Sequence, residues 1–338
     1  MHSFDRYSLT WFCVSQAYYL KFFWLAYLLC MLFVDYFKVS GQVVHTMQSQ
    51  NGAVTGIAAL NDRLYVSGTQ QIAVYCPATF QYQQDLNFTC TDCGYQSNKF
   101  SCTNFRHRGR SFYSCADECN IFNMVGCDVN NCLYASDHGN SCIYKVSLDQ
   151  NSMSLWSARN PHGLSVTNSH NLLVALNSCI WPLSEYSTDG VYIRRIDFPL
   201  SIDNPVHALQ LSDGRYGVIH FSPAHQFSIL GSDGRLVGSY CGDAGGMNEP
   251  RGIAVDERGR VFVADHNNNR ILIINSRTLS AYPLPLPEEC TLEGPYSLYY
   301  DTVNSRLYIG ETSGRRVVCC KILWTFTSMI RCFHHIYC

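Results

Sequence analysis

One phrase of sequence recurs six times along the 338 residues, and this repetition constrains the fold more than any other feature. Its clearest copy, EPRGIAVDERGRVFVADHNNNRILIINS, runs from Glu249 to Ser276. With Gly252 as the marker of the phrase, successive copies are separated by 68, 39, 44, 45 and 45 residues. The six marker positions are Gly56, Met124, Gly163, His207, Gly252 and Ser297. Units repeated at such a period bury their apolar faces by stacking against one another.

Each copy has the pattern of a small antiparallel sheet. Short apolar segments alternate with polar turns, in the clearest copy at 253–255, 261–264, 271–274 and 279–284. One four-stranded unit every ~40–45 residues is typical of a propeller blade. The sequence therefore predicts an all-β fold, a six-bladed β-propeller of four-stranded antiparallel blades.

The copies resemble NHL repeats. The resemblance is carried by Pro250, Gly252-Ile253-Ala254-Val255-Asp256, Gly259, Val261-Phe262-Val263-Ala264-Asp265 and Asn269-Arg270-Ile271. The copies at 161 and 205 are less regular, with Leu176 and His220 where Asp265 would stand. The resemblance extends over residues 42–323 and implies a six-bladed NHL-type propeller.

The last copy offers only three strands, so the ring needs a fourth strand from elsewhere. The segment Gln42 to Gln48 (QVVHTMQ) has β character and precedes the first copy. We expect it to pair beside Arg316–Lys321, which would close the ring and cover the edge of the last blade.

The N-terminal part differs from the repeats. An unbroken apolar run of 13 residues, Phe22 to Val34, has the length of the central region of a signal peptide. We predict a signal peptide or signal anchor at 1–41, with cleavage after Gly41 plausible; a buried N-terminal helix is the third interpretation. Under the first two, the rest of the chain is extracellular, either secreted or anchored to the membrane through this segment. The sequon Asn87-Phe88-Thr89 is then a glycosylation site.

Cysteine is abundant, with 18 residues in the chain. A polar insert at 89–120 separates the first two blades, and nine cysteines occupy the 67 residues around it. In an exported protein such a cluster favours disulfides. The candidates are Cys76, Cys90, Cys93, Cys102, Cys115, Cys119, Cys127, Cys132 and Cys142. Zinc is the alternative, since Cys90-x2-Cys93, His107 and Cys115-x3-Cys119 have suitable ligand types, but the spacing matches no zinc module that we can name.

The net charge of the chain does not favour binding to nucleic acid. The 24 Lys and Arg residues are balanced by 26 Asp and Glu, which leaves a formal charge of −2. Binding to phosphates needs clustered basic residues. We therefore expect no nucleic-acid partner. Residues 324–338 follow no blade pattern and have no predicted role.

The candidate binding site lies where the inner strands begin, since those positions converge on one mouth of a propeller channel. We expect His162, His207, Arg251 and Tyr296 there, forming a polar, mildly cationic mouth. His138 and His266 share a second equivalent position, each directly after an Asp. No H-x-H, HExxH or nucleophile-elbow motif occurs, so no catalytic residue, metal ligand or cofactor is predicted.

The sequence favours a recognition module over an enzyme. Its loop faces and Cys-rich insert would bind a protein, a peptide or a glycan, an inference that rests on fold analogy. The alternative is a metal-dependent lyase or hydrolase with its site in the channel. One NHL-like enzyme family, the peptide-amidating lyases, holds zinc there with histidines, although those ligands cannot be matched residue by residue in this chain.

Overall fold

The computed structural model describes residues 37–90, 96–97, 102–107, 110–115, 119–177, 182–197, 199, 202–222, 224–242 and 246–326. The chain divides into two compact units. One is Gly41–Ile322, and the other combines Met1–Ser40 with Leu323–Cys338. The predicted signal segment up to residue 36 and the tail from residue 327 lie outside the described residues.

Six sheets arranged as a propeller make up the unit Gly41–Ile322, as the repeats predict. Blade 1 has strands β2 (Gly56–Leu60), β3 (Arg63–Ser67), β4 (Ile72–Tyr75) and β5 (Tyr82–Asp85), and blade 2 has β10 (Ile121–Cys127), β11 (Cys132–Asp137), β12 (Cys142–Ser147) and β13 (Ser152–Ser157). Blade 3 has β14 (Pro161–Val166), β15 (Leu172–Leu176), β16 (Leu183–Tyr186) and β17 (Tyr192–Arg195), and blade 4 has β18 (Asp203–Gln210), β19 (Tyr216–Ser222), β20 (Gln226–Leu230) and β21 (Leu236–Tyr240). Blade 5 has β22 (Pro250–Val255), β23 (Arg260–Asp265), β24 (Arg270–Asn275) and β25 (Ala281–Pro283), with a short 3₁₀ helix η1 (His266–Asn268) after β23.

Blade 6 closes the ring with a strand from the beginning of the chain. Its order is β1 (Phe37–Gln48), β28 (Arg316–Phe326), β27 (Arg306–Glu311) and β26 (Pro295–Asp301). The expected pairing of residues 42–48 beside 316–321 is therefore confirmed. Both strands are longer than expected: β1 begins before Gly41, and β28 includes residues 324–326, which the sequence analysis had placed in the tail.

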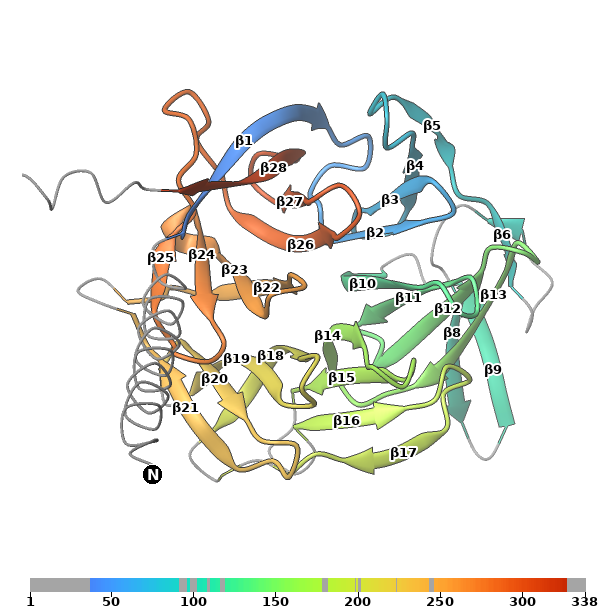
Figure 1. Ribbon diagram of the computed structural model, residues 1–338. Helices are drawn as coiled ribbons and strands as arrows, with labels where there is room; N and C mark the ends of the chain where they lie inside the picture. Colours follow the sequence, from blue (N-terminus) through green and yellow to red (C-terminus); the bar gives the residue numbers. More distant parts are fainter. Residues whose placement is uncertain are drawn as a thin grey trace, which may run out of the picture. The chain divides into compact units, whose positions relative to one another are not determined.

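The first strand of each blade lies nearest the centre of the ring (Figure 1). Each of these inner strands, β2, β10, β14, β18, β22 and β26, contacts the inner strand of the next blade, and β26 contacts β2. Buried apolar side chains fill the spaces between neighbouring sheets, as where Phe262 of blade 5 stacks on Tyr300 of blade 6 with ring centroids 5.5 Å apart. This packing fixes the inner strands and the loops at their ends.

The marker positions pack against one another in pairs of small and larger residues. A Cβ atom on Gly56 would lie 2.5 Å from Met124 Cβ, and one on Gly163 would lie 2.6 Å from His207 Cδ2. Gly252 lies against the backbone of Tyr296 and Ser297 in the same way. Glycine therefore lets the inner strands of neighbouring blades approach closely.

The Cys-rich insert contains strands that the sequence analysis did not anticipate. Strands β6 (Phe88–Cys90) and β7 (Gln96–Ser97) extend blade 2 to six strands, with β6 parallel to β13. Strands β8 (Cys102–His107) and β9 (Arg110–Cys115) form a separate antiparallel pair. Of the candidate disulfide residues, Cys93 lies outside the described residues, and for Cys90, Cys102 and Cys115 only the backbone is described.

The described cysteine side chains are free thiols. They are Cys76, Cys119, Cys127, Cys132, Cys142, Cys241, Cys290, Cys319 and Cys320. Burial raises the pKa of both Cys119 and Cys142 to about 12, so these thiols are protonated and unreactive at neutral pH. Within the described part of the chain, no group of three or more His, Cys, Asp or Glu side chains is placed to hold a metal ion. In those same residues there is no helix with the length and apolar character needed to cross a membrane.

Candidate functional site

The start of the first strand is irregular in five of the six blades. In blades 2 to 6, the pairing between the first and second strands shifts there in the manner of a β-bulge. The residues inside these shifts are Phe122, His162 with Gly163, Val206, Arg251 with Gly252, and Tyr296. A bulge redirects a side chain out of the regular ladder. Because equivalent positions of the blades converge at the centre, these bulges bring side chains from different blades together.

The assembled side chains form what we call the mouth cluster. Its members are Phe122 and His138 of blade 2, His162 of blade 3, Phe221 and His225 of blade 4, Glu249, Arg251 and His266 of blade 5, and Tyr296 of blade 6. Phe122 is central: its ring stacks on His162 at a centroid distance of 4.6 Å and meets Tyr296 edge to face at 5.7 Å. Ring contacts join blades 2, 3, 5 and 6, and the Arg251 guanidinium links the Phe221 ring of blade 4 to this group.

Three of the four residues expected at the mouth belong to this cluster, namely His162, Arg251 and Tyr296. His207 does not. In blade 4 the bulged residue is Val206, and His207 has returned to the ladder opposite Ile219. Its side chain is buried between blades, where Nε2 lies 3.0 Å from the Leu164 carbonyl and Nδ1 lies 3.4 Å from the Ile253 amide nitrogen. His207 therefore acts as a packing residue, and its pKa is lowered to about 4 by burial.

The two histidines beside Phe122 are closely spaced. The ring centroids of His138 and His162 lie 4.6 Å apart. Burial lowers the pKa of His162 to about 4, with further lowering by His138 and Arg251. His162 is therefore a neutral imidazole at pH 7. In both rings Nδ1 is buried and has no hydrogen-bond partner.

Arg251 supplies the cationic group of the cluster. Its Nη2 donates to Glu249 Oε2 at 2.7 Å, and its guanidinium carbon lies 5.2 Å and 5.7 Å from the ring centroids of Phe221 and Tyr296. Its Nε is buried without a partner. Because Glu249 balances the charge of Arg251 and His162 is neutral, the mouth is less cationic than the sequence suggested.

Glu249 is held in a strained backbone conformation. Its φ is 50°, which non-glycine residues seldom adopt. Its amide donates to His225 Nδ1 at 3.1 Å while its carboxylate accepts from Arg251. The strain therefore positions a carboxylate against Arg251, and such strain tends to be found at functional sites.

The sequence analysis missed Phe122, Phe221, His225 and Glu249. Phe122 lies one residue outside the repeat register because of the bulge between Ile121 and Asn123. The other three lie in or beside the loops that connect strands, where the repeats are least alike. His138 and His266, which the sequence analysis placed at equivalent positions directly after an Asp, both join the cluster.

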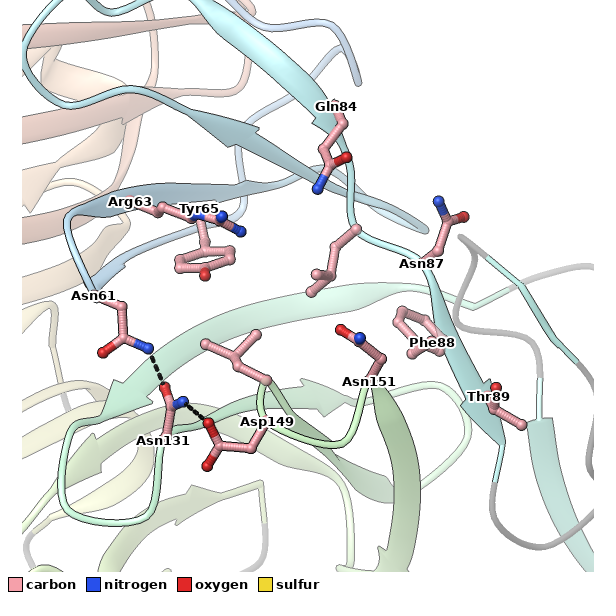
Figure 2. Close-up of a pocket in the computed structure, with 12 residues that line it drawn as sticks. Asn61, Arg63, Tyr65, Gln84, Asn87, Phe88, Thr89, Asn131, Asp149 and Asn151 are labelled. Carbon is pink, nitrogen blue, oxygen red and sulfur yellow. Dashed lines mark hydrogen bonds between the residues drawn. The ribbon is translucent and has the colours of Figure 1, made fainter.

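A separate groove lies between blades 1 and 2 and has a volume of about 980 Å³. Figure 2 shows its lining residues: Asn61, Arg63, Tyr65, Gln84, Leu86, Asn87, Phe88, Thr89, Asn131, Leu148, Asp149 and Asn151. Along one side, Asn61 donates to Asn131, which in turn donates to Asp149. The sequon residue Asn87 is exposed at this groove.

Comparison with known proteins supports the fold. The NHL repeat family model matches residues 247–274, which correspond to β22–β24 of blade 5. No curated protein matches the sequence.

Similar solved structures include virginiamycin B lyase from Staphylococcus aureus, with a TM-score of 0.57, 10% identity, and coverage of 85% of this chain and 100% of that one. A protein of unknown function from Bacteroides caccae has a TM-score of 0.53 at 14% identity, covering 73% of this chain and 81% of that one. Kuenenia stuttgartiensis hydrazine synthase has a TM-score of 0.53 at 12% identity, covering 83% and 98%. Identities this low establish the fold alone. The chain is therefore a six-bladed β-propeller whose fifth blade contains an NHL repeat.

Proposed function

We propose that this propeller is a recognition module that binds a peptide segment of a partner protein at the mouth cluster. NHL propellers generally mediate protein interactions. The observation that carries the proposal is the set of three buried polar atoms without partners, His138 Nδ1, His162 Nδ1 and Arg251 Nε. A buried polar atom without a partner costs about 1–3 kcal/mol, so a ligand group that pairs with these atoms would recover that cost.

The chemistry of these atoms suggests the group that would be recognised. The neutral His162 ring offers a lone pair, and Arg251 Nε offers an N–H donor. A carboxamide or a backbone peptide group has both an N–H donor and a carbonyl acceptor, so it complements this set. The rings of Phe122 and Tyr296 provide apolar contact around it.

Phe122 is the expected cover of the site. It is half-buried and stacked on His162, whose Nδ1 is inaccessible in the free chain. We expect its ring to turn aside when a peptide enters, since a phenylalanine on a bulge is held by fewer backbone constraints than one inside a regular ladder.

A second candidate function is that of a lyase or hydrolase. It is favoured by the close pair His138 and His162 and by the fold shared with virginiamycin B lyase. An enzyme of this kind would use the neutral His162 as a base or ligand. Metal analysis of the purified protein tests this alternative, and stoichiometric metal lost on replacing both histidines would favour it.

We also propose that the protein acts outside the cytosol, secreted or anchored by its N-terminal segment. The support is the apolar run Phe22–Val34 and the exposed sequon residue Asn87. Determining the N-terminus of the protein recovered from the medium tests this location and distinguishes a cleaved signal from an anchor.

The binding proposal is tested by selecting random phage-displayed peptides on the purified propeller. Enriched peptides are then titrated against four proteins: the wild type, Arg251→Ala, His162→Phe and Arg235→Ala. His162→Phe keeps an aromatic ring against Phe122 but removes the lone pair. Arg235 is the matched control, since its side chain is 89% exposed in a turn of blade 4.

We expect both mouth variants to weaken binding about ten-fold, as loss of a buried hydrogen bond of about 1.4 kcal/mol implies. Arg235→Ala should bind like the wild type. Enriched peptides that bind all four proteins equally would refute the mouth cluster as the recognition site.

A further inference from the structure

We propose that the groove between blades 1 and 2 is occupied by the first sugars of an N-linked glycan on Asn87. This inference requires export of the chain but is independent of the mouth cluster as a binding site. It assigns the groove to a carbohydrate that belongs to this protein, instead of to an external ligand.

The sequon is built into the wall of the groove. Asn87, Phe88 and Thr89 follow one another along that wall (Figure 2). Phe88 is only 2% exposed and packs in the core between blades 1 and 2, which anchors the segment. The Thr89 amide donates to the Asn151 carbonyl at 2.8 Å. Next to the buried Phe88, Asn87 is exposed, so the sequon asparagine is accessible at the rim of the groove.

The lining of the groove has the hydrogen-bonding groups that a sugar needs. Four amide side chains besides Asn87 line it, from Asn61, Gln84, Asn131 and Asn151. An amide donates and accepts, which matches hydroxyl and N-acetyl groups. Arg63 and Asp149 are the charged lining residues, and they balance, so the groove offers no net charge to an ionic ligand.

Three further lining residues, Leu86, Phe88 and Leu148, offer apolar contact. Leu86 and Phe88 belong to the core cluster between blades 1 and 2, and Leu148 packs against it. The C–H face of a pyranose and the methyl of an N-acetyl group suit such a floor. The volume of about 980 Å³ lies at the upper end of the range of about 300–1,000 Å³ for ligand pockets, so there is room for more than one sugar ring.

Covalent attachment makes weak contacts sufficient. A tethered group experiences an effective concentration in the millimolar range, so a site with about millimolar affinity is substantially filled. An external sugar or peptide would have to supply its own affinity. The location of Asn87 at the groove therefore favours the attached glycan as occupant.

The test uses the full-length chain produced in secretory eukaryotic cells. Wild type is compared with Asn87→Gln, which abolishes the sequon, and with Thr89→Ser, which keeps it. Glycan occupancy at Asn87 is measured by peptide mass spectrometry. Backbone hydrogen exchange is then measured over 61–65 and 148–151, with 301–305 in blade 6 as an internal control.

We expect Asn87 to carry a glycan in wild type and Thr89→Ser but not in Asn87→Gln. Amides of 61–65 and 148–151 should exchange several-fold faster in Asn87→Gln and in enzymatically deglycosylated wild type, with 301–305 unchanged. An unmodified Asn87 would overturn the proposal. A modified Asn87 with identical exchange before and after deglycosylation would overturn it as well, because the sugars would then project into solvent. Neither result bears on peptide binding at the mouth.

Discussion

Replacing Gly252 with alanine should strain the contact between the inner strands of blades 5 and 6. A Cβ at this position would lie 3.1 Å from both Leu298 N and Ser297 Cα, and well inside 3.0 Å of the Tyr296 carbonyl oxygen. All three obstacles are backbone atoms of β26, so no side chain can rotate away. Restoring ordinary contact needs a movement of about 1 Å in strands that are locked into a closed ring.

The expected loss of stability follows from two opposing effects. Overpacking of a rigid interior costs about 1–3 kcal/mol, and the obstruction by backbone favours the upper half of that range. Alanine also restricts the unfolded chain, which returns about 0.4–1 kcal/mol. The net loss is then about 2 kcal/mol. Since 1 kcal/mol shifts Tm by about 2–4 °C in domains of about 150–250 residues, and less in larger ones, the Tm should fall by about 4 °C.

Differential scanning calorimetry of Gly252→Ala and Gly139→Ala provides the comparison. A Cβ on Gly139 would meet only Asp137 Oδ1 at an ordinary 3.6 Å. The same chemical change there should leave the Tm unchanged or raise it slightly. If Gly252→Ala melted like Gly139→Ala, the close approach of β22 and β26 and the packing of the marker positions would be wrong.

Three further predictions follow from the fold. Burial lowers the pKa of His162 and His207 from 6.5 to about 4, so between these pH values the unfolded chain binds protons that the folded chain does not. The free energy of unfolding should therefore fall by roughly 3 kcal/mol per histidine as the pH drops from 6.5 to 4. In urea titrations, His207→Gln should show a shallower pH dependence than the wild type, and an equal dependence would contradict these pKa values. Deleting residues 42–48 removes most of β1 and should leave β28 as an open strand edge. The deletion variant should then aggregate in size-exclusion chromatography. A monomeric profile like that of the wild type would refute ring closure by this strand. Cys127 and Cys132 are free thiols in the structure, but they are register partners across β10 and β11, so oxidation after export should join them. Non-reducing peptide maps of exported protein should then show this disulfide, and two alkylatable thiols there would exclude it.

The ring itself could be predicted from the sequence because its determinants are local and repeated. The spacing of the markers from Met124 to Ser297 set the blade length, and Pro250 to Asn275 gave one blade nearly in full. The closing strand could be predicted because a last blade with three strands leaves an unsatisfied edge. These inferences needed only the period of the repeat and the rule that an exposed strand edge must find a hydrogen-bonding partner.

The mouth could be predicted only in part because side-chain direction depends on bulges. Arg251 and Tyr296 each lie one residue before the marker of their blade, and this shared position brings them together at the mouth. His207 is itself the marker of blade 4, where Val206 occupies the position equivalent to Arg251, so His207 faces the interior. In blade 2 the bulge places Phe122 two residues before the marker Met124, and the period of the repeat does not predict such a one-residue shift. The pairing of β6 with β13 could not be predicted from the sequence either, because it joins Thr89 to Ser152, which are far apart along the chain.

The most direct test of the account is a crystal structure of the propeller with a peptide selected on it. The account predicts that an amide of the peptide lies within about 3.2 Å of Arg251 Nε and of Nδ1 on His138 or His162, with the Phe122 ring turned away from His162. A peptide bound in the groove between blades 1 and 2 or along an outer strand, with the mouth cluster unchanged, would contradict it.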